Sequence, residues 1–426
     1  MNIFSKLRAG ALLLAAAGLT LSACEDELEP PYQVQDEGGF ATLGAQPSGV
    51  QTKYAPGETV PLVVSYNADD RVRDITVFHV INRADSAVVS TTAGGGGSLS
   101  STTGLTEQVV NYVVPSSLAN KVQVRVDVTT TFENGATRMR RFFYNVAAAP
   151  TLRFGTTASP TTITTFRNNL AATAQAEGDV VGYNVVINEG GIATVPTTPT
   201  TATLFKNVDS LTTFYRIGSG APVRIGVVRN PSTGAANART VDATIPAGSR
   251  GQNVTFVFTA YAGPFSTTVT SAPITVAAPA ALARVRTGRV TAGSGAPQDS
   301  SSFDLRLGAN VLNSAAAATK DVYAYVSSTS TGAAAVGMRA ENTTVFYRIP
   351  AAQAAAGYYD NASANAVGLL LFQNAASLTA NPGVVAPNDV FAVRVRGAEP
   401  MLLRVRGVRT STAGSTARIT FDYRAL

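Results

Sequence analysis

The sequence predicts a mainly β protein in which tandem antiparallel β-sandwiches precede a β-rich C-terminal domain of the α+β kind. Charged residues make up only 14% of the 426 residues and hydrophobic residues 45%, a poor composition for long charged surface helices. Short stretches of alternating apolar and polar residues recur along the chain, and turns rich in Gly, Pro and Asn separate them. A chain of this length holds about two to four domains, each able to bury its own core.

The first 23 residues have the three parts of an export signal. Lys6 and Arg8 form a basic start, residues 9–21 are apolar, and the small residues Ser22 and Ala23 follow. The apolar stretch is shorter than the roughly 18 residues that a membrane-spanning helix needs. We therefore expect residues 1–23 to be a signal peptide that is removed, rather than a permanent transmembrane helix.

Cys24 is the only cysteine, so no disulfide can form within the chain, and it directly follows Leu21-Ser22-Ala23. These four residues resemble the lipobox of bacterial lipoproteins. The resemblance implies that lipid, such as palmitate, is attached to Cys24 and that the membrane is a partner of the protein. Stable anchoring takes more than one acyl chain, because a single chain binds a membrane only marginally. The alternative is an ordinary cleavable signal in which Cys24 has no role.

The segment after Cys24 is acidic. Residues 25–31 read EDELEPP and resemble the acidic export signal of Bacteroidetes lipoproteins, which implies display on the outer face of the outer membrane. The periplasmic face is the alternative location, and a solvated acidic spacer is the alternative reading of the segment. Residues 24–45 contain Pro and Gly and lack periodicity, so we expect a flexible tether without a core.

The first domain is expected over residues 46–149. Val60–Tyr66 and Ile75–Ile81 have strand patterns, and residues 122–146 read as a hairpin around the turn at Glu133–Gly135. Short strands at this spacing, with no helical periodicity between them, resemble the Ig-like modules of bacterial surface proteins. The sequence has no Trp and no Cys pair, so the internal marks of antibody-type domains are missing.

Two further domains are expected. Residues 150–278 echo the first domain in placing a Pro-containing turn before a strand, and they read as a second sandwich that closes with Ser271–Val276. Residues 279–426 are expected to form a mixed domain with five strands, together with helical segments at 350–357 and 362–378. The end of the chain resembles the C-terminal modules of uncharacterised Bacteroidetes lipoproteins, which implies no particular chemistry.

Four arginines are the candidate binding residues. Arg394 and Arg396 alternate with valines, as do Arg404 and Arg406, and a hairpin turning at residues 397–400 would place all four guanidinium groups on one face. Residues 279–426 carry a net charge of +6, which favours anionic partners such as lipid A phosphates or acidic glycans. Such a face either binds an anion or is the solvent-exposed side of an antiparallel sheet.

No other motif indicates a catalytic centre, a metal site or a cofactor. His79 is the only histidine and lies on a predicted strand, so it forms neither a metal cluster nor a recognisable Ser-His-Asp arrangement. Asp69, Asp70 and Asp74 match no calcium-binding loop, and Gly94–Gly97 lacks the Lys of a phosphate-binding loop. The arginines are not interleaved with aromatic residues, so we expect no nucleic-acid partner.

Two functions are consistent with the sequence. The first is a membrane-anchored surface lipoprotein with a binding or structural role, whose ligand is a glycan or a surface protein. The second is an extracellular hydrolase whose carboxylates converge only in the fold, about 5–10 Å apart in a cleft and with at least one of them buried. We expect the first function and no enzymatic activity, because no catalytic motif is present.

Overall fold

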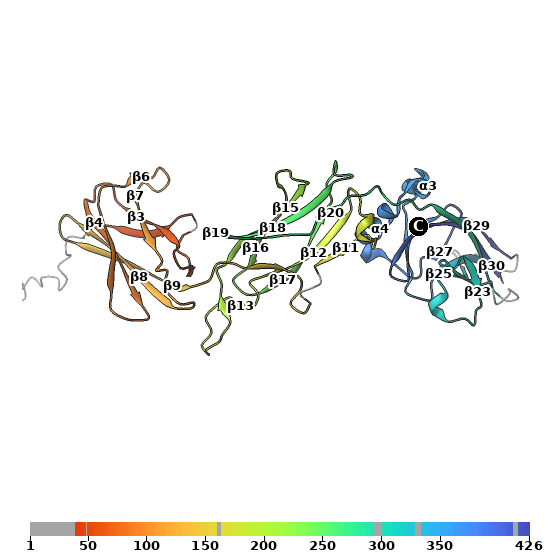
Figure 1. The fold of residues 1–426 in the computed structure, drawn as a ribbon, viewed down its shortest axis with the longest axis horizontal. Coiled ribbons are helices and arrows are strands. Elements are labelled where there is room, and N and C mark those ends of the chain that lie inside the picture. The colour runs from red at the N-terminus through yellow and green to blue at the C-terminus, as the bar shows by residue number, and fades with distance from the viewer. Residues whose placement is uncertain (1–38, 48, 160–162, 294–299, 329–333, 412–415) are drawn as a thin grey trace, which may run out of the picture. The chain divides into compact units, whose positions relative to one another are not determined.

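The structure of the protein is a computed structural model. It describes residues 39–47, 49–159, 163–293, 300–328, 334–411 and 416–426. The chain separates into two compact units, residues 1–146 and 147–426 (Figure 1). Antiparallel strands account for most of the regular structure, which confirms the mainly β prediction. Cys24, the predicted signal peptide and most of the predicted tether lie outside the described residues.

None of the described helices is long and apolar enough to cross a membrane.

The first unit is a β-sandwich of the immunoglobulin-like kind. One sheet has the order β1 (Ala41–Ala45), β3 (Thr59–Tyr66), β7 (Thr106–Val113) and β6 (Ser98–Leu99). The other has the order β2 (Lys53–Tyr54), β9 (Thr137–Val146), β8 (Gln123–Phe132), β4 (Val72–Ile81) and β5 (Ala87–Ala93). Side chains at alternate positions, such as Leu62, Ile75 and Val124, fill the core between the sheets. Tyr112 on β7 and Tyr144 on β9 join the two sheets through a hydrogen bond of 2.7 Å between their hydroxyl groups.

Strand β1 corrects the expected extent of the tether. Residues 41–45 pair with β3, and Ala41 and Ala45 are buried in the core of the first unit. The backbone N–H of Phe40 donates to Asp70 Oδ2 at 3.0 Å, which holds the start of the strand. The sequence prediction missed this strand because the alanines bury little apolar surface and follow an acidic, Gly-containing stretch.

The second unit begins with another β-sandwich. Its first sheet is built on β12 (Val180–Ile187), which pairs with β10 (Leu152–Phe154), β11 (Thr164–Phe166) and β17 (Asn237–Thr244). Its second sheet contains β16 (Val223–Ser232), β15 (Val208–Ile217), β18 (Asn253–Ala262), β19 (Phe265–Thr270) and β20 (Ile274–Thr275). The short strands β13 (Gly191–Ile192) and β14 (Thr203–Leu204) form a separate parallel pair. Tyr183, Phe256 and Phe258 form an aromatic cluster in the core.

The expected closing strand at 271–276 is shorter than predicted. Only Ile274–Thr275 is a strand, and Ser271 instead hydrogen-bonds through its hydroxyl to the backbone N–H of Phe256 at 2.9 Å. Strands β18 and β19 form the hairpin instead, with the turn at Gly263 between them. A side-chain hydrogen bond to the backbone competes with the strand ladder at this position.

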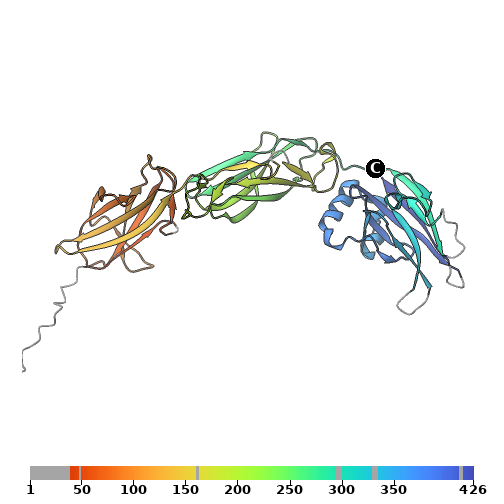
Figure 2. The same cartoon turned by 90° about the horizontal axis from the view of Figure 1, so that it is seen from below.

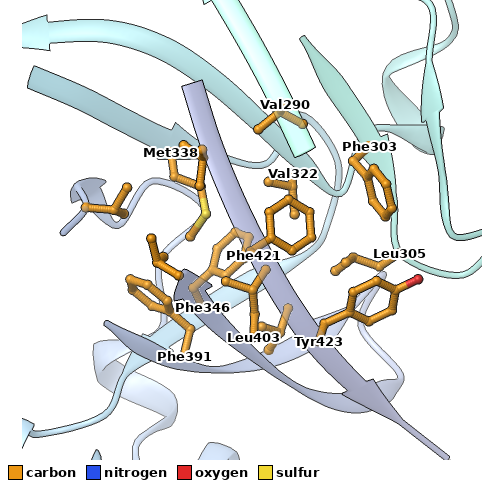
Figure 3. Packing of buried hydrophobic residues seen from close by; sticks show 14 of the residues in the cluster. Val290, Phe303, Leu305, Val322, Met338, Phe346, Phe391, Leu403, Phe421 and Tyr423 are labelled. Carbon is orange, nitrogen blue, oxygen red and sulfur yellow. The ribbon is translucent and has the colours of Figure 1, made fainter. Parts of the chain in front are cut away.

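The C-terminal module, residues 279–426, has two five-stranded sheets. Between them lies a hydrophobic core that is separate from the core of the second sandwich (Figure 3). The first sheet, called the outer sheet below, has the order β21 (Arg284–Gly293), β30 (Thr416–Ala425), β29 (Glu399–Thr410), β28 (Val390–Val395) and β26 (Val345–Arg348). The second has the order β23 (Ala309–Val311), β22 (Ser302–Asp304), β24 (Val322–Ser328), β25 (Ala334–Arg339) and β27 (Gly383–Val384). Phe303, Phe421 and Tyr423 contact one another in the core.

The sequence predicted five strands in this module, and the structure corrects that number. Strand β25 was missed because it is rich in Ala and Gly, and β21 because Gly288 interrupts its pattern. The two expected helical segments are confirmed in α2 (Ala351–Ala355) and α4 (Ala364–Gln373), and α3 (Tyr358–Asn361) is a further short helix between them. The three helices gather on one side of the module (Figure 2). Their apolar residues pack on the outer sheet against Ala392 and Leu402.

Helix α4 also joins the C-terminal module to the second sandwich within the second unit. Asn365 Nδ2 donates to Asp179 Oδ2 at 2.5 Å and to the carbonyl of Ala174 at 2.9 Å. Gly368 lies so close to Asn168 that a Cβ there would be 2.5 Å from the Asn168 carbonyl oxygen. The second unit therefore combines residues that the sequence assigned to two domains, 150–278 and 279–426.

Candidate functional site

The hairpin predicted around residues 397–400 exists, but the four candidate arginines do not share one face. Arg394 pairs with Pro400 and Arg404 with Val390, so Arg394 and Arg404 lie on the helix-bearing face of the outer sheet. Arg396 lies in the turn with a left-handed backbone, φ 49°, next to Gly397 at φ 76°. This conformation directs Arg396 toward the second sheet.

Arg396 forms a buried ion-pair cluster with two aspartates. Its Nε donates to Asp321 Oδ1 at 3.0 Å and its Nη2 to Asp321 Oδ2 at 2.9 Å, while Nη2 lies 2.7 Å from Asp304 Oδ2. The Asp321 side chain is 0% exposed and that of Asp304 9%. Asp321 also accepts hydrogen bonds from Thr344 Oγ1 and Asn342 Nδ2.

This cluster bears on the hydrolase hypothesis. Asp304 and Asp321 both contact one Arg396 nitrogen, so two buried carboxylates do come together. Both also accept hydrogen bonds from backbone N–H groups, Asp321 from Leu305 at 2.9 Å and Asp304 from Leu307 at 2.8 Å. Their geometry is that of a structural ion-pair cluster, in which the lone pairs are already engaged.

Arg404 and Arg394 are also partly withdrawn from solvent. Arg404 lies 4.1 Å from the centre of the Tyr359 ring of α3, and its Nη atoms lie 3.3 Å from Asp360 Oδ2 and 3.5 Å from Asp422 Oδ2. Burial lowers the pKa of Arg394 from its usual value, since desolvation disfavours the charged form. The prediction of four guanidinium groups on one exposed face is therefore wrong.

A different set of arginines does form an exposed face. We call Arg289, Arg406, Arg409 and Arg418 the arginine face; all four side chains are exposed and come from strands β21, β29 and β30 of the outer sheet. Arg409 lies directly opposite Arg418, which in turn lies opposite Thr291, two residues from Arg289. The alternate residues Val290, Ala417 and Ile419 are buried, so the arginines point away from the core.

Few acidic groups balance the arginine face. Arg406 Nε lies 3.1 Å from Asp422 Oδ2, whereas no described carboxylate lies within ion-pair distance of Arg289, Arg409 or Arg418. Like charges directly opposite each other on a sheet destabilise it, and diagonal neighbours lie only about 7–8 Å apart. The face is thus a concentrated positive charge on a rigid sheet.

An open groove of about 490 Å³ adjoins the arginine face. It is lined by Arg289 and Arg406 and by the polar residues Thr287, Asn310, Thr420 and Asp422. At its base Gly288 allows the Phe421 ring to approach, since a Cβ at Gly288 would lie 2.4 Å from Phe421 Cζ. The groove therefore offers hydrogen-bonding groups beside the cationic surface.

The remaining candidates of the sequence lie in the first unit. His79 is on β4, where burial lowers its pKa, and Asp70 holds β1 in place. The described residues contain no group of three His, Cys, Asp or Glu side chains able to hold a metal ion. Gly94 packs against the backbone of Val72, as expected of a structural loop.

Sequence reasoning missed Arg289, Arg409 and Arg418, although a signal was present. Each lies at a polar position of an alternating stretch, Arg-Val-Thr-Ala in β21, Val-Arg-Thr in β29 and Arg-Ile-Thr-Phe in β30. The pairing of β21 with β30 could not be predicted from the sequence, because the two strands are far apart in the chain.

Comparisons with known proteins assign no family to the chain. No protein-family model matches it, and no curated protein matches it. Among solved structures, the sporulation control protein Spo0M from Bacillus subtilis is 9% identical, covering 55% of this chain and 90% of its own, with a TM-score of 0.18. A tetra-tandem repeat from the extending region of a large adhesion protein is 8% identical, covering 86% of this chain and 70% of its own, with a TM-score of 0.20.

Proposed function

We propose that the protein is a lipid-anchored lipoprotein of the outer cell surface whose C-terminal module binds an anionic polymer, in its most specific form an acidic glycan. The observation that carries this proposal is the arginine face, where Arg289, Arg409 and Arg418 are exposed without a carboxylate partner among the described residues. A ligand with spaced negative charges removes the repulsion between these groups and so binds favourably.

The energetics favour a polymer over a small anion. An exposed ion pair contributes about 0.2–1 kcal/mol, so four arginines together contribute about 1–4 kcal/mol. A dissociation constant of 1 mM corresponds to about 4 kcal/mol, so a single contact with one anion is weak. Repeated charges on a polymer, and many protein copies on one membrane, raise the effective affinity through multivalency.

The N-terminal sequence supports surface attachment. The lipobox-like residues that end at Cys24 supply the lipid site, and the acidic segment 25–31 supplies the export signal. In this arrangement the lipid fixes one end of the chain at the membrane and the tether leaves the β domains accessible to extracellular polymers.

Metabolic labelling with a fatty acid analogue tests the anchor. Cells expressing the native protein should incorporate label and lose the protein to external protease, whereas Cys24→Ala should abolish the label. Label that persists in Cys24→Ala contradicts the anchor, and label combined with protease resistance places the protein on the periplasmic side.

Chromatography on immobilised polygalacturonate tests the arginine face. The double variant Arg409→Gln/Arg418→Gln should elute at lower NaCl concentration than the native chain, because salt screens fewer ionic contacts. Arg224→Gln/Arg229→Gln is the matched control, since these exposed arginines lie on β16 and the net charge changes equally. Equal shifts for both variants would show only a general charge effect and would contradict the proposal.

A further inference from the structure

A second concave site lies in the first unit, where the β4–β5 turn meets β8 and β9. The pocket measures about 430 Å³ and is lined by Val80, Arg83, Ala84, Gln123, Arg125 and Phe143. Phe143, Arg125 and Val80 lie side by side across three neighbouring strands. The pocket thus combines an apolar wall with three polar side chains on a rigid sheet.

Phe143 provides a flat apolar surface. Its neighbours on β9, Phe142 and Tyr144, are buried in the core. Strand alternation therefore turns Phe143 outward, where the residue is 51% exposed. A single exposed aromatic residue is ordinary on protein surfaces. Phe143 differs from such residues because it borders a pocket that also contains hydrogen-bond donors.

Arg83 lies at the pocket in a backbone conformation that arginine rarely adopts. Asn82 and Arg83 have φ angles of 48° and 63°, and the turn is held by the Ala84 N–H, which donates to the Ile81 carbonyl at 2.9 Å. The Asn82 N–H donates to the Gln123 carbonyl and ties this turn to β8. Asn and Gly suit this conformation, so an arginine here is costly to the fold and indicates a use for its guanidinium group.

The pocket has an excess of positive charge. Asp127 contacts both Arg125, with Nε to Oδ2 at 3.1 Å, and Arg141, with Nε to Oδ1 at 2.5 Å. The contact of Arg125 Nε lacks hydrogen-bond geometry, and this buried nitrogen has no hydrogen-bond partner among the described residues. Asp85 also lies in the turn but forms no ion pair with Arg83 in the described structure.

We infer that this pocket binds the carboxylated ring of a uronic acid residue in an acidic glycan. The apolar face of the sugar ring packs on Phe143, the carboxylate accepts hydrogen bonds from Arg83 and Arg125, and the Gln123 amide contacts ring hydroxyl groups. The inference deepens the proposed function by naming the sugar class, and it rests on that function only in expecting an acidic glycan outside the cell. Its residues are separate from the arginine face.

Isothermal titration calorimetry on residues 24–426 carrying Cys24→Ala tests the inference, with trigalacturonate as the probe. Arg83→Gly should raise the dissociation constant about tenfold, because a charge-assisted hydrogen bond is lost while glycine suits the left-handed backbone. Phe143→Leu should weaken binding several-fold by removing the flat ring. Met139→Leu is the matched control, since Met139 is also 51% exposed on β9 and does not line the pocket.

Three results would overturn the inference: no binding by the native chain, equal effects of Met139→Leu and Phe143→Leu, or equally strong binding of the carboxyl-reduced, neutral trisaccharide. Arg409→Gln/Arg418→Gln separates this site from the proposed function. Trisaccharide binding that this variant removes and Arg83→Gly does not would place the sugar on the arginine face and contradict the pocket. If Arg409→Gln/Arg418→Gln still binds the trisaccharide and elutes from polygalacturonate at the same NaCl concentration as the native chain, the result would support the pocket and contradict the arginine face.

Discussion

Replacing Arg396 with methionine is expected to destabilise the C-terminal module strongly. The change leaves Asp321, whose side chain is 0% exposed, and Asp304, 9% exposed, without the guanidinium group that contacts both. Breaking a buried ion pair by removing one partner costs about 3–5 kcal/mol, because the remaining charge is buried and unpaired. Asp321 keeps hydrogen bonds from Thr344 and Asn342, so we expect the lower end, about 3 kcal/mol. Urea unfolding followed by far-UV circular dichroism gives the free energy of unfolding.

Two further variants define the cause. Arg396→Gly should lose about 1 kcal/mol less than Arg396→Met, since glycine relieves the left-handed backbone at φ 49°. Arg406→Met should cost less than about 1 kcal/mol, because Arg406 is 59% exposed and its pair with Asp422 lies at the surface. Hydrogen exchange of peptides from β22 and β24 shows whether the lost stability belongs to the C-terminal module. If Arg396→Met and Arg406→Met cost the same, the cluster is not a major source of stability and our reasoning is refuted.

Other perturbations test the remaining features. Burial raises the pKa of the Asp179 carboxyl group. Its contribution to stability should therefore be fully present below the ordinary carboxyl pKa of about 4 and be lost as pH rises through the raised value. The urea midpoint of Asp179→Asn should change less with pH than that of the native chain, and identical pH profiles would argue against this. Gly368→Ala should lower the melting temperature of the second unit, because a Cβ there would lie 2.5 Å from the Asn168 carbonyl oxygen, whereas an unchanged melting curve would mean that the junction yields easily. Arg83→Gly should raise the free energy of unfolding of the first unit by about 1 kcal/mol through relief of its left-handed backbone, and a loss of stability would show that the guanidinium supports the fold.

The sequence predicted the strands whose alternation is regular and missed those that lack large apolar residues. The hairpin of β8 and β9 follows directly from its valine and aromatic alternation and from the turn at Glu133–Gly135. Strand β1 was missed, because two alanines give no clear pattern even where a neighbouring strand buries them. Local pattern reports burial only when the side chains are large enough to mark it.

Of the four arginines predicted from the sequence, only Arg406 belongs to the exposed arginine face. An anion-binding surface of arginines on the outer sheet was expected, yet Arg396 is directed away by its left-handed backbone and Arg404 is covered by Tyr359 of α3. The exposed pair Arg409 and Arg418 was missed, because it depends on a bulge between Val405 and Gly407 that shifts the register of β29 against β30. Turn dihedrals and bulges of this kind are set by the packed structure and leave little trace in a single sequence.

The hydroxyl contact between Tyr112 and Tyr144 has a consequence for how the first unit is made. In antibody domains a disulfide links the two sheets through the core, and such domains need an oxidising compartment to mature. Here two buried tyrosines make that link by a hydrogen bond, with the edge-on packing of their rings at 6.1 Å between centroids. Thiol reductants should therefore leave the stability of this core unchanged. The core can form on either side of a membrane without an oxidase or a disulfide isomerase.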